Sequence, residues 1–175
     1  MTQKTIYIAG DHAAFELKEK IKKYLATRGY KIKDFGPSKY DPTDDYPDFV
    51  IPAARAVAAS AVEEVGSRVA PQNAGRAETR PQRAAPTPIY GIVLGGSGIG
   101  ECMAANKIKG IRAALVYDQY TAKMSREHNN ANILCLGART VTKNFSLVKK
   151  ILNIWLTTPF SNEPRHIRRL KKIEK

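Results

Sequence analysis

The chain of 175 residues has the length of one ordinary domain, and its hydrophobic fraction of 43% excludes a disordered or fibrous protein. No apolar run approaches the ~20 residues that span a membrane, so we expect no membrane association. The net charge of +13 is compatible with a nucleic acid, an acidic membrane or a small anionic substrate as partner.

Charge distribution and cysteine usage narrow these choices. The positive charge is concentrated in residues 66–88 and in the last third of the chain, without a basic helix interleaved with aromatic residues. We therefore do not expect a nucleic-acid partner. Cys102 and Cys135 have no CxxC spacing and are interpreted as packing residues. The chain enters a strand pattern directly after its first residues, so we expect no signal peptide and a cytoplasmic location.

Strand and helix patterns alternate along the chain. Short apolar or alternating segments predict strands, and apolar residues recurring every three or four positions predict helices. In chain order we predict a strand at Thr5–Ala9, a helix at Phe15–Arg28, a strand at Tyr30–Phe35, a helix from Tyr46 to about Val65, a strand at Ile89–Leu94, a helix through 104–107, a strand at Ile111–Tyr117, a helix at Gln119–His128, a strand at Ala131–Leu136, a helix at Ser146–Leu156 and a basic helix from about Asn162.

This alternation predicts an α/β fold with a parallel sheet covered by helices on both faces. We expect a single domain over 1–175: a three-layer Rossmann-like sandwich with five strands in the order 2-1-3-4-5 and an extended C-terminal helix. Residues 66–88 are rich in Pro, Gly, Ala and Arg and show no periodicity, which favours a flexible insertion. The turns after the first and third strands, at Gly10–His12 and Gly95–Gly100, should converge at the switch point.

The turn Gly95-Gly-Ser-Gly-Ile-Gly100 is followed by Glu101. It is one residue short of the dinucleotide pattern G-x-G-x-x-G, and Glu101 and Cys102 stand where a Walker A loop has Lys and Ser or Thr. Both nucleotide interpretations therefore fail. Backbone N–H groups at such a turn can stabilise a transient oxyanion while a neighbouring carboxylate moves a carbon-bound proton. The alternatives are a turn that serves tight packing and a glutamate that only complements the helix dipole.

Seven motifs in order resemble the type B ribose-5-phosphate isomerases, over nearly the whole chain except 66–88. The motifs are Gly10-Asp-His-Ala13, Asp45-Tyr-Pro47, Gly95–Glu101, Ala104-Ala-Asn-Lys107, Gly110-Ile-Arg112, Ser125–Asn130 and Gly137-Ala-Arg139, and the tail Arg165–Arg169 fits as well. One variant of that family has a cysteine just before the turn, where this chain has Gly95. The other variant uses a glutamate after the turn, and Glu101 matches it.

The resemblance implies an aldose–ketose isomerase that interconverts D-ribose 5-phosphate and D-ribulose 5-phosphate through an enediolate, without metal or organic cofactor. The alternative is an allose-6-phosphate or galactose-6-phosphate isomerase of the same family. The resemblance also implies a homodimer, or a tetramer of such dimers, in which each active site contains residues of both subunits.

The resemblance further implies the role of each site residue. Glu101 is the base, Ser97 acts with the N–H groups around Gly96, Gly98 and Gly100 on the reacting oxygens, and Asp11 contacts the sugar. His128 opens the furanose ring and Asn129 binds hydroxyl groups. The phosphate is expected to lie near His12 in a clamp of Arg139, Arg165, His166 and Arg169, while Asp45 and Tyr46 border the sugar. Without the resemblance, an alternative is that Asp11 is a helix N-cap and His12 a surface residue.

Overall fold

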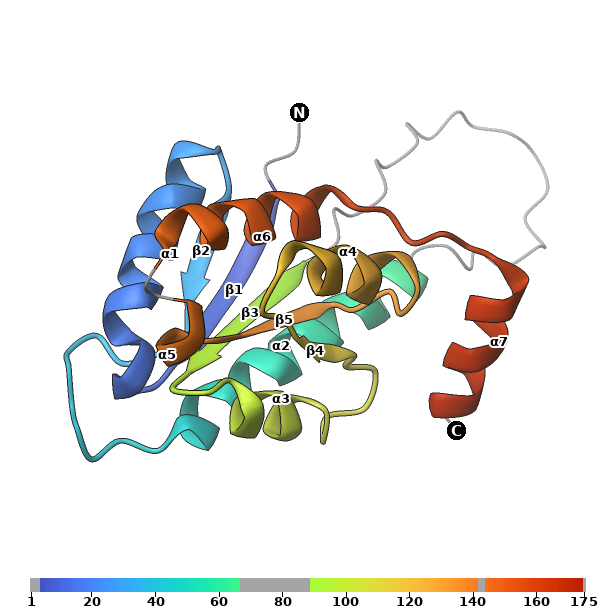
Figure 1. Cartoon of the computed structure of the whole chain (residues 1–175). Coiled ribbons are helices and arrows are strands. Elements are labelled where there is room, and N and C mark those ends of the chain that lie inside the picture. The colour runs from blue at the N-terminus through green and yellow to red at the C-terminus, as the bar shows by residue number, and fades with distance from the viewer. Residues whose placement is uncertain (1–3, 67–88, 142–143, 175) are drawn as a thin grey trace, which may run out of the picture.

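The computed structural model describes residues 4–66, 89–141 and 144–174, with side chains omitted for 61–66, and shows a five-stranded parallel sheet between two layers of helices (Figure 1). The strands lie in the order β2-β1-β3-β5-β4. Their bounds are β1 Thr5–Gly10, β2 Lys31–Asp34, β3 Tyr90–Gly95, β4 Ala113–Leu115 and β5 Ile133–Gly137. The helices are η1 His12–Ala14, α1 Phe15–Thr27, α2 Tyr46–Gly66, α3 Ile99–Ala105, α4 Gln119–Glu127, α5 Ala138–Val141, α6 Phe145–Thr157 and α7 Pro164–Ile173.

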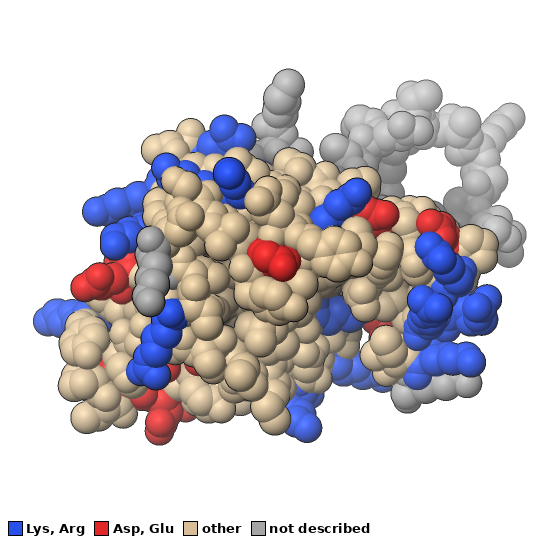
Figure 2. Space-filling view, in the orientation of Figure 1, with Lys and Arg blue, Asp and Glu red and all other residues tan. Residues whose placement is uncertain are grey.

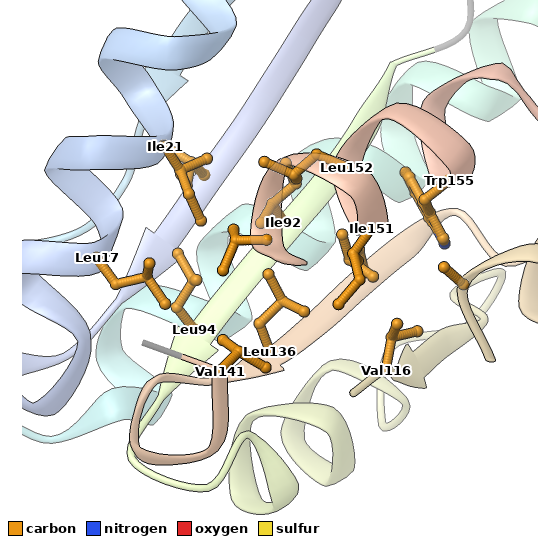
Figure 3. Close-up of a cluster of buried hydrophobic side chains, with 14 of the residues drawn as sticks. Leu17, Ile21, Ile92, Leu94, Val116, Leu136, Val141, Ile151, Leu152 and Trp155 are labelled. Atoms are coloured by element: carbon orange, nitrogen blue, oxygen red, sulfur yellow. The ribbon is translucent and has the colours of Figure 1, made fainter. Parts of the chain in front are cut away.

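Alternating strand residues supply two separate hydrophobic cores, because successive side chains of a strand point to opposite faces. Ile92 and Leu94 of β3 pack with α1, α4 and α6 in one cluster, whose side chains Figure 3 shows. Val93 packs with α2 and α3 in the other. Trp155 of α6 is completely buried in the first cluster and meets the ring of Tyr90 edge-on at 5.3 Å between ring centroids. The predicted α/β sandwich is therefore confirmed.

The predicted positions of the last two strands were wrong: β5 lies beside β3, and β4 forms the edge of the sheet. Every residue of β5 is buried, as a central strand requires, and it pairs with β3 from Gly91↔Ile133 to Gly95↔Gly137. β4 has three hydrogen-bonded residues, all half-buried. The prediction followed chain order, whereas the continuous apolar character of Ile133–Gly137 is what selects the interior position.

Other expectations concern segments outside the sheet. The expected insertion at 66–88 falls outside the described residues, apart from Gly66 at the end of α2. No helix in the described part of the chain is long and apolar enough to cross a membrane. The short helix α5 was not predicted. The basic C-terminal helix is α7, which begins with Pro164 at its first turn and lies at one end of the molecule, away from α1 and β2 (Figure 1).

Cys135 of β5 is buried in the hydrophobic cluster that contains Val93, and Cys102 of α3 packs against the same cluster. The Cys102 thiol is also within 3.4 Å of the carbonyl oxygen of Ala113. Both cysteines are free thiols that fill the space between α3 and the sheet, as expected from the sequence.

Candidate active site

The turns that follow β1 and β3 lie side by side at the carboxyl edge of the sheet. Gly10 at the end of β1 pairs in register with Leu94 of β3, so Asp11 and Gly95 begin neighbouring turns. β2 and β3 flank β1 on opposite sides, which makes the gap between β1 and β3 the point where the strand order reverses. Ligands of parallel sheets bind at such a point. The predicted convergence of these two turns is confirmed.

Glu101 lies in the first turn of α3 with its carboxylate directed at the glycine turn. The residue is only 4% exposed. A Cβ atom added to Gly95 would lie 1.6 Å from Oε1 of Glu101, so the carboxylate fills the space beside that glycine. Burial raises the pKa of Glu101 above its ordinary value; its own backbone N–H opposes this rise, and the charge of Asp11 adds to it. A buried carboxylate of raised pKa is suited to accept a proton near neutral pH.

Asp11 faces the same crevice from the end of β1. It is buried, and its Oδ1 accepts a hydrogen bond of 3.1 Å from the backbone N–H of Ala13, which caps η1. Burial raises the pKa of Asp11, while neighbouring His12 and the backbone N–H groups act in the opposite direction. The capping role that the sequence left open is therefore present, and it coexists with an electrostatic contact to Glu101.

The glycine turn packs so tightly that Gly98 and Gly100 leave no room for a side chain. Gly98 has φ 78°, and a Cβ there would come within 2.8 Å of atoms in β4 and β5. A Cβ on Gly100 would lie 2.8 Å from the ring of Tyr46, which therefore covers the start of α3. Ser97 is exposed, and its Oγ accepts a hydrogen bond of 3.2 Å from the backbone N–H two residues later. This bond uses the hydroxyl as an acceptor and leaves its proton free to be donated.

A cleft of about 410 Å³ opens next to this turn. Its lining residues are His12, Ala13, Glu16, Leu17, Lys20, Tyr40, Ala138 and Arg139. The guanidinium of Arg139 lies against Gly96, where a Cβ would be 3.2 Å from Cζ, and the backbone N–H of Arg139 donates to the Gly96 carbonyl oxygen at 3.0 Å. Two basic side chains and an imidazole against one carboxylate make this cleft suitable for a phosphate group.

One residue of this region was missed by the sequence interpretation. Asp44 contacts His12, and its Oδ1 lies 2.7 Å from Nδ1 of the imidazole. The sequence interpretation named only its neighbour Asp45, as a residue that borders the sugar. Asp45 is exposed, and its carbonyl oxygen accepts the backbone N–H of Asp48 at 3.1 Å. The only signal in the sequence was the pair of adjacent aspartates before Tyr46, and composition cannot say which of two neighbours points inward.

Asp11, His12 and Asp44 also form the group of side chains that could hold a metal ion. One ligand atom from each residue lies within 4.8 Å of the other two, a juxtaposition that no spacing in the sequence predicted and that is unique among the described residues. The same atoms are used internally, because Asp11 caps η1 and Asp44 binds the imidazole. These hydrogen bonds account for the cluster as part of the loop structure.

Five predicted residues lie elsewhere, around the C-terminus of α4 and on α7. The rings of His128 and His166 are 4.3 Å apart between centroids, and Nδ1 of His166 lies 2.7 Å from Oγ of Ser161. Burial and the nearby His128 lower the pKa of His166. The group is completed by Asn129, Arg165 and Arg169, all exposed.

This second group lies at the amino edge of the sheet. The backbone N–H of Asn132, which follows the turn after α4, donates to Arg112 just before β4, and the carbonyl oxygen of Asn132 accepts from Gly91 at the start of β3. Four residue steps of β3 separate Gly91 from Gly95, roughly 13 Å at about 3.3 Å per residue. In Figure 1 the arrow of β3 points away from α7. One chain therefore does not bring His128, Asn129, Arg165, His166 or Arg169 to Glu101.

Buried Arg126 fixes the turn that carries His128 and Asn129. Its Nη1 donates to Oδ1 of Asn130 at 3.1 Å, and its Nη2 donates to Oη of Tyr90 at 3.0 Å. Asn130 has φ 46°, a left-handed conformation that asparagine tolerates better than most residues. The turn that carries His128 and Asn129 is therefore tied to the start of β3.

Comparisons with known proteins show which family this chain resembles. The family model described as Ribose/Galactose Isomerase matches residues 6–66 and 83–173. The chain is 38% identical over 170 residues to ribose-5-phosphate isomerase B of Mycobacterium tuberculosis, covering 97% of this chain and 88% of that protein. It is 37% identical over 168 residues to a probable ribose-5-phosphate isomerase B of Mycoplasma genitalium, covering 96% and 92%.

This chain belongs to the ribose/galactose isomerase family. The crystal structure of the Mycoplasma genitalium ribose-5-phosphate isomerase B with bound ribulose-5-phosphate has a TM-score of 0.78 and 36% identity, and the match covers 99% of this chain and 96% of that one. Membership of this family makes the chain an isomerase. The family match omits residues 67–82, which lie within the segment interpreted as an insertion.

In this family member, basic side chains gather on α7 (Figure 2). They are Arg165, Arg168, Arg169, Lys171 and Lys172. Arg165 pairs with Glu163 at 2.7 Å between Nε and Oε2. Large apolar side chains are exposed on another surface near the glycine turn: Ile99 and Met103 on α3, with Tyr117 just before α4 and Tyr120 in its first turn.

Proposed function

We propose that this isomerase interconverts D-ribose 5-phosphate and D-ribulose 5-phosphate, with Glu101 as the base. The observation that carries the proposal is the buried carboxylate of Glu101 at the switch point, beside the glycine turn and Asp11. The names of the relatives support the substrate, and the adjoining basic cleft is suited to its phosphate group.

The reaction begins with the closed furanose form of the sugar, which must open before it isomerises. In the proposal, His128 of the partner subunit exchanges protons with the ring oxygen and the C1 hydroxyl group, because an imidazole can both donate and accept a proton. Asp11 contacts the sugar hydroxyl groups or the ring oxygen. The product of this step is the open-chain aldehyde, with a carbonyl group at C1.

Glu101 then removes the proton on C2. The electron pair of the C2–H bond forms the C1=C2 bond, and the C1 carbonyl oxygen becomes an enediolate oxygen. Ser97 and backbone N–H groups between Gly96 and Gly100 stabilise this charge. Return of the proton from Glu101 to C1, with transfer of the O2 proton to O1, gives the ketose. The raised pKa of Glu101 supports both directions of transfer, because the carboxyl group must accept and release the same proton.

The proposal includes a homodimer with a composite site. His128, Asn129, Arg165, His166 and Arg169 lie at the amino edge of their own sheet, so they can reach a glycine turn only on another copy of the chain. The exposed apolar residues Ile99 and Met103 next to the turn offer a surface for such a copy. Arg139 and His12 would then hold one side of the phosphate and the α7 arginines of the partner subunit the other.

Steady-state kinetics with matched sugar phosphates tests the substrate. The purified enzyme should convert ribose 5-phosphate with a higher kcat/KM than allose 6-phosphate or galactose 6-phosphate. A clear preference for either hexose phosphate would replace the pentose by that hexose, and absence of turnover with all three would overturn the proposed function.

A further inference from the structure

The loop between β2 and α2 carries an aspartate that fixes the ring of His12. Oδ1 of Asp44 lies 2.7 Å from Nδ1 of the imidazole and also accepts the backbone N–H of His12 at 3.0 Å. The Asp44 side chain is 8% exposed, whereas the imidazole is 29% exposed. One carboxylate oxygen therefore holds both the backbone and the ring of His12 from the buried side.

This contact determines which ring nitrogen can meet a ligand. An imidazole that donates from Nδ1 to a carboxylate has only Nε2 left for another partner. His12 lines the cleft that also contains Arg139 and Lys20. The ring of Tyr40 meets the imidazole edge-on, with centroids 6.3 Å apart and planes at 89°, and supports it from a second side.

The buried position of the Asp44 carboxylate destabilises the fold. Its other oxygen, Oδ2, is buried and has no hydrogen-bond partner among the described residues. A buried carboxylate oxygen without a partner is unfavourable, because it has lost its water without replacement. Such a feature is expected where a charge is needed for function.

We propose that Asp44 is a positioning residue that holds His12 as a protonated imidazole, with Nε2 directed at the phosphate group of the substrate beside Arg139. The proposal rests on the proposed function, because it needs a sugar phosphate in this cleft. The ligand class is a phosphate dianion, for which a charged N–H donor is a stronger partner than a neutral imidazole.

The charges around His12 favour its protonated form. The hydrogen bond with Asp44 raises the pKa of His12; partial burial opposes this effect, and the charge of Asp11 adds to it. The charged or titratable groups that face the imidazole or share its cleft are Asp11, Asp41, Asp44, Glu16, Lys20, Tyr40 and Arg139. Asp44 is the group in direct contact, so the state of His12 depends on it most.

Binding of the phosphate group should depend on pH through the charge of His12. Because the pKa of His12 is raised, its charge is present below that pKa and is lost as the pH rises through it. A phosphate monoester becomes a dianion above about pH 6. Tight binding is therefore expected between the phosphate pKa and the raised pKa of His12. Removal of the Asp44 charge should lower the upper limit of this window and leave the lower limit in place.

The test measures KM and kcat for ribose 5-phosphate from pH 6 to 9 in the wild type, Asp44→Asn and the control Asp41→Asn. Asp41 lies in the same loop and is exposed, and its side chain accepts from Thr43, so its variant removes an equal charge without removing a direct contact to the imidazole. At pH 8, Asp44→Asn should raise KM by roughly tenfold, because His12 then loses its charge at a lower pH, with kcat within about twofold of the wild type. Asp41→Asn should match the wild type.

A direct measurement covers the case in which Asp44→Asn fails to fold. An NMR titration of ¹⁵N-labelled histidines in the wild type, assigned with His12→Asn, should show His12 with a proton on Nδ1 and a pKa above about 6.5. A His12 pKa at or below that value, or an Asp44→Asn variant with unchanged KM at pH 8, would overturn the inference while wild-type turnover persists. Loss of the proposed function itself would appear separately, as a wild type without isomerase activity.

Discussion

The carboxylate of Glu101 occupies the space that any side chain at position 95 would need. A Cβ on Gly95 would lie 1.6 Å from Oε1 and 2.1 Å from Cδ of Glu101. In the family that the sequence resembles, one variant has a cysteine at that position and the other has a glutamate after the turn. The geometry gives a reason for the two alternatives: a side chain at residue 95 and the carboxylate of residue 101 cannot both occupy this space.

Gly95→Ala tests this relationship with one methyl group. The methyl group must displace the carboxylate, so we expect kcat to fall by at least ~100-fold, in the range that loss of a positioned general base produces. Steady-state kinetics measure this loss, and thermal unfolding checks the fold. The matched control is Gly29→Ala, a site where a Cβ meets nothing within 4 Å and only the positive φ of 81° is strained. A Gly95→Ala enzyme with near-normal kcat would contradict the assignment of Glu101.

The acid side of the pH profile should report Glu101. Its pKa is raised by burial, so the carboxyl group becomes protonated, and useless as a base, at a higher pH than an ordinary glutamate. We expect log(kcat/KM) to fall as the pH decreases through a value above the ordinary value of about 4.5, and Glu101→Gln to bind ribose 5-phosphate but lose most turnover. Kinetics and isothermal titration calorimetry measure the two properties. Substantial turnover by Glu101→Gln would exclude this residue as the base.

Mixed dimers should reveal whether the site is composite. Glu101→Gln and His128→Asn are each expected to be poorly active with ribose 5-phosphate, since each homodimer lacks one group at both sites. Mixing the two variants and allowing subunits to exchange should restore one intact site in each heterodimer, up to about half of the wild-type activity per heterodimer. Two differently tagged variants, copurified and assayed, provide the measurement, and the doubly substituted chain mixed with itself is the control. No recovery in verified heterodimers would place both residues in the same subunit's site.

His128 should matter most where the ring must open. His128→Asn is expected to slow conversion of cyclic ribose 5-phosphate far more than conversion of the open-chain ketose. Initial rates in both directions measure this difference, with Lys123→Asn on an exposed position of α4 as a control. Equal losses in both directions would argue against a separate ring-opening role.

Removal of the segment interpreted as an insertion should be tolerated. The family match omits residues 67–82, and the candidate site contains none of them. A chain in which 67–82 are replaced by a short Gly/Ser linker should retain kcat/KM within about threefold, because loop length has a modest energetic cost. A folded but inactive deletion variant would show that the segment contributes to the site.

The sequence alone was sufficient to predict the parts of the site that a topological rule brings together from distant segments. The turns after β1 and β3 had to meet at the carboxyl edge of a parallel sheet, and Asp11 and Glu101 do so. The order of β4 and β5 was beyond this rule, since both alternatives satisfy right-handed crossovers. Asp44 was missed because the path of an irregular loop decides which of two adjacent aspartates turns inward, and no periodicity encodes that path.

The placement of α7 also bears on how the enzyme responds to its own concentration. If the arginines of α7 bind the phosphate at the site of a neighbouring copy, as proposed, each isolated copy holds two halves of different sites. Turnover would then follow mass action: specific activity should drop when the protein is diluted below the dissociation constant of its subunits, and substrate, by bridging two copies, should oppose that loss.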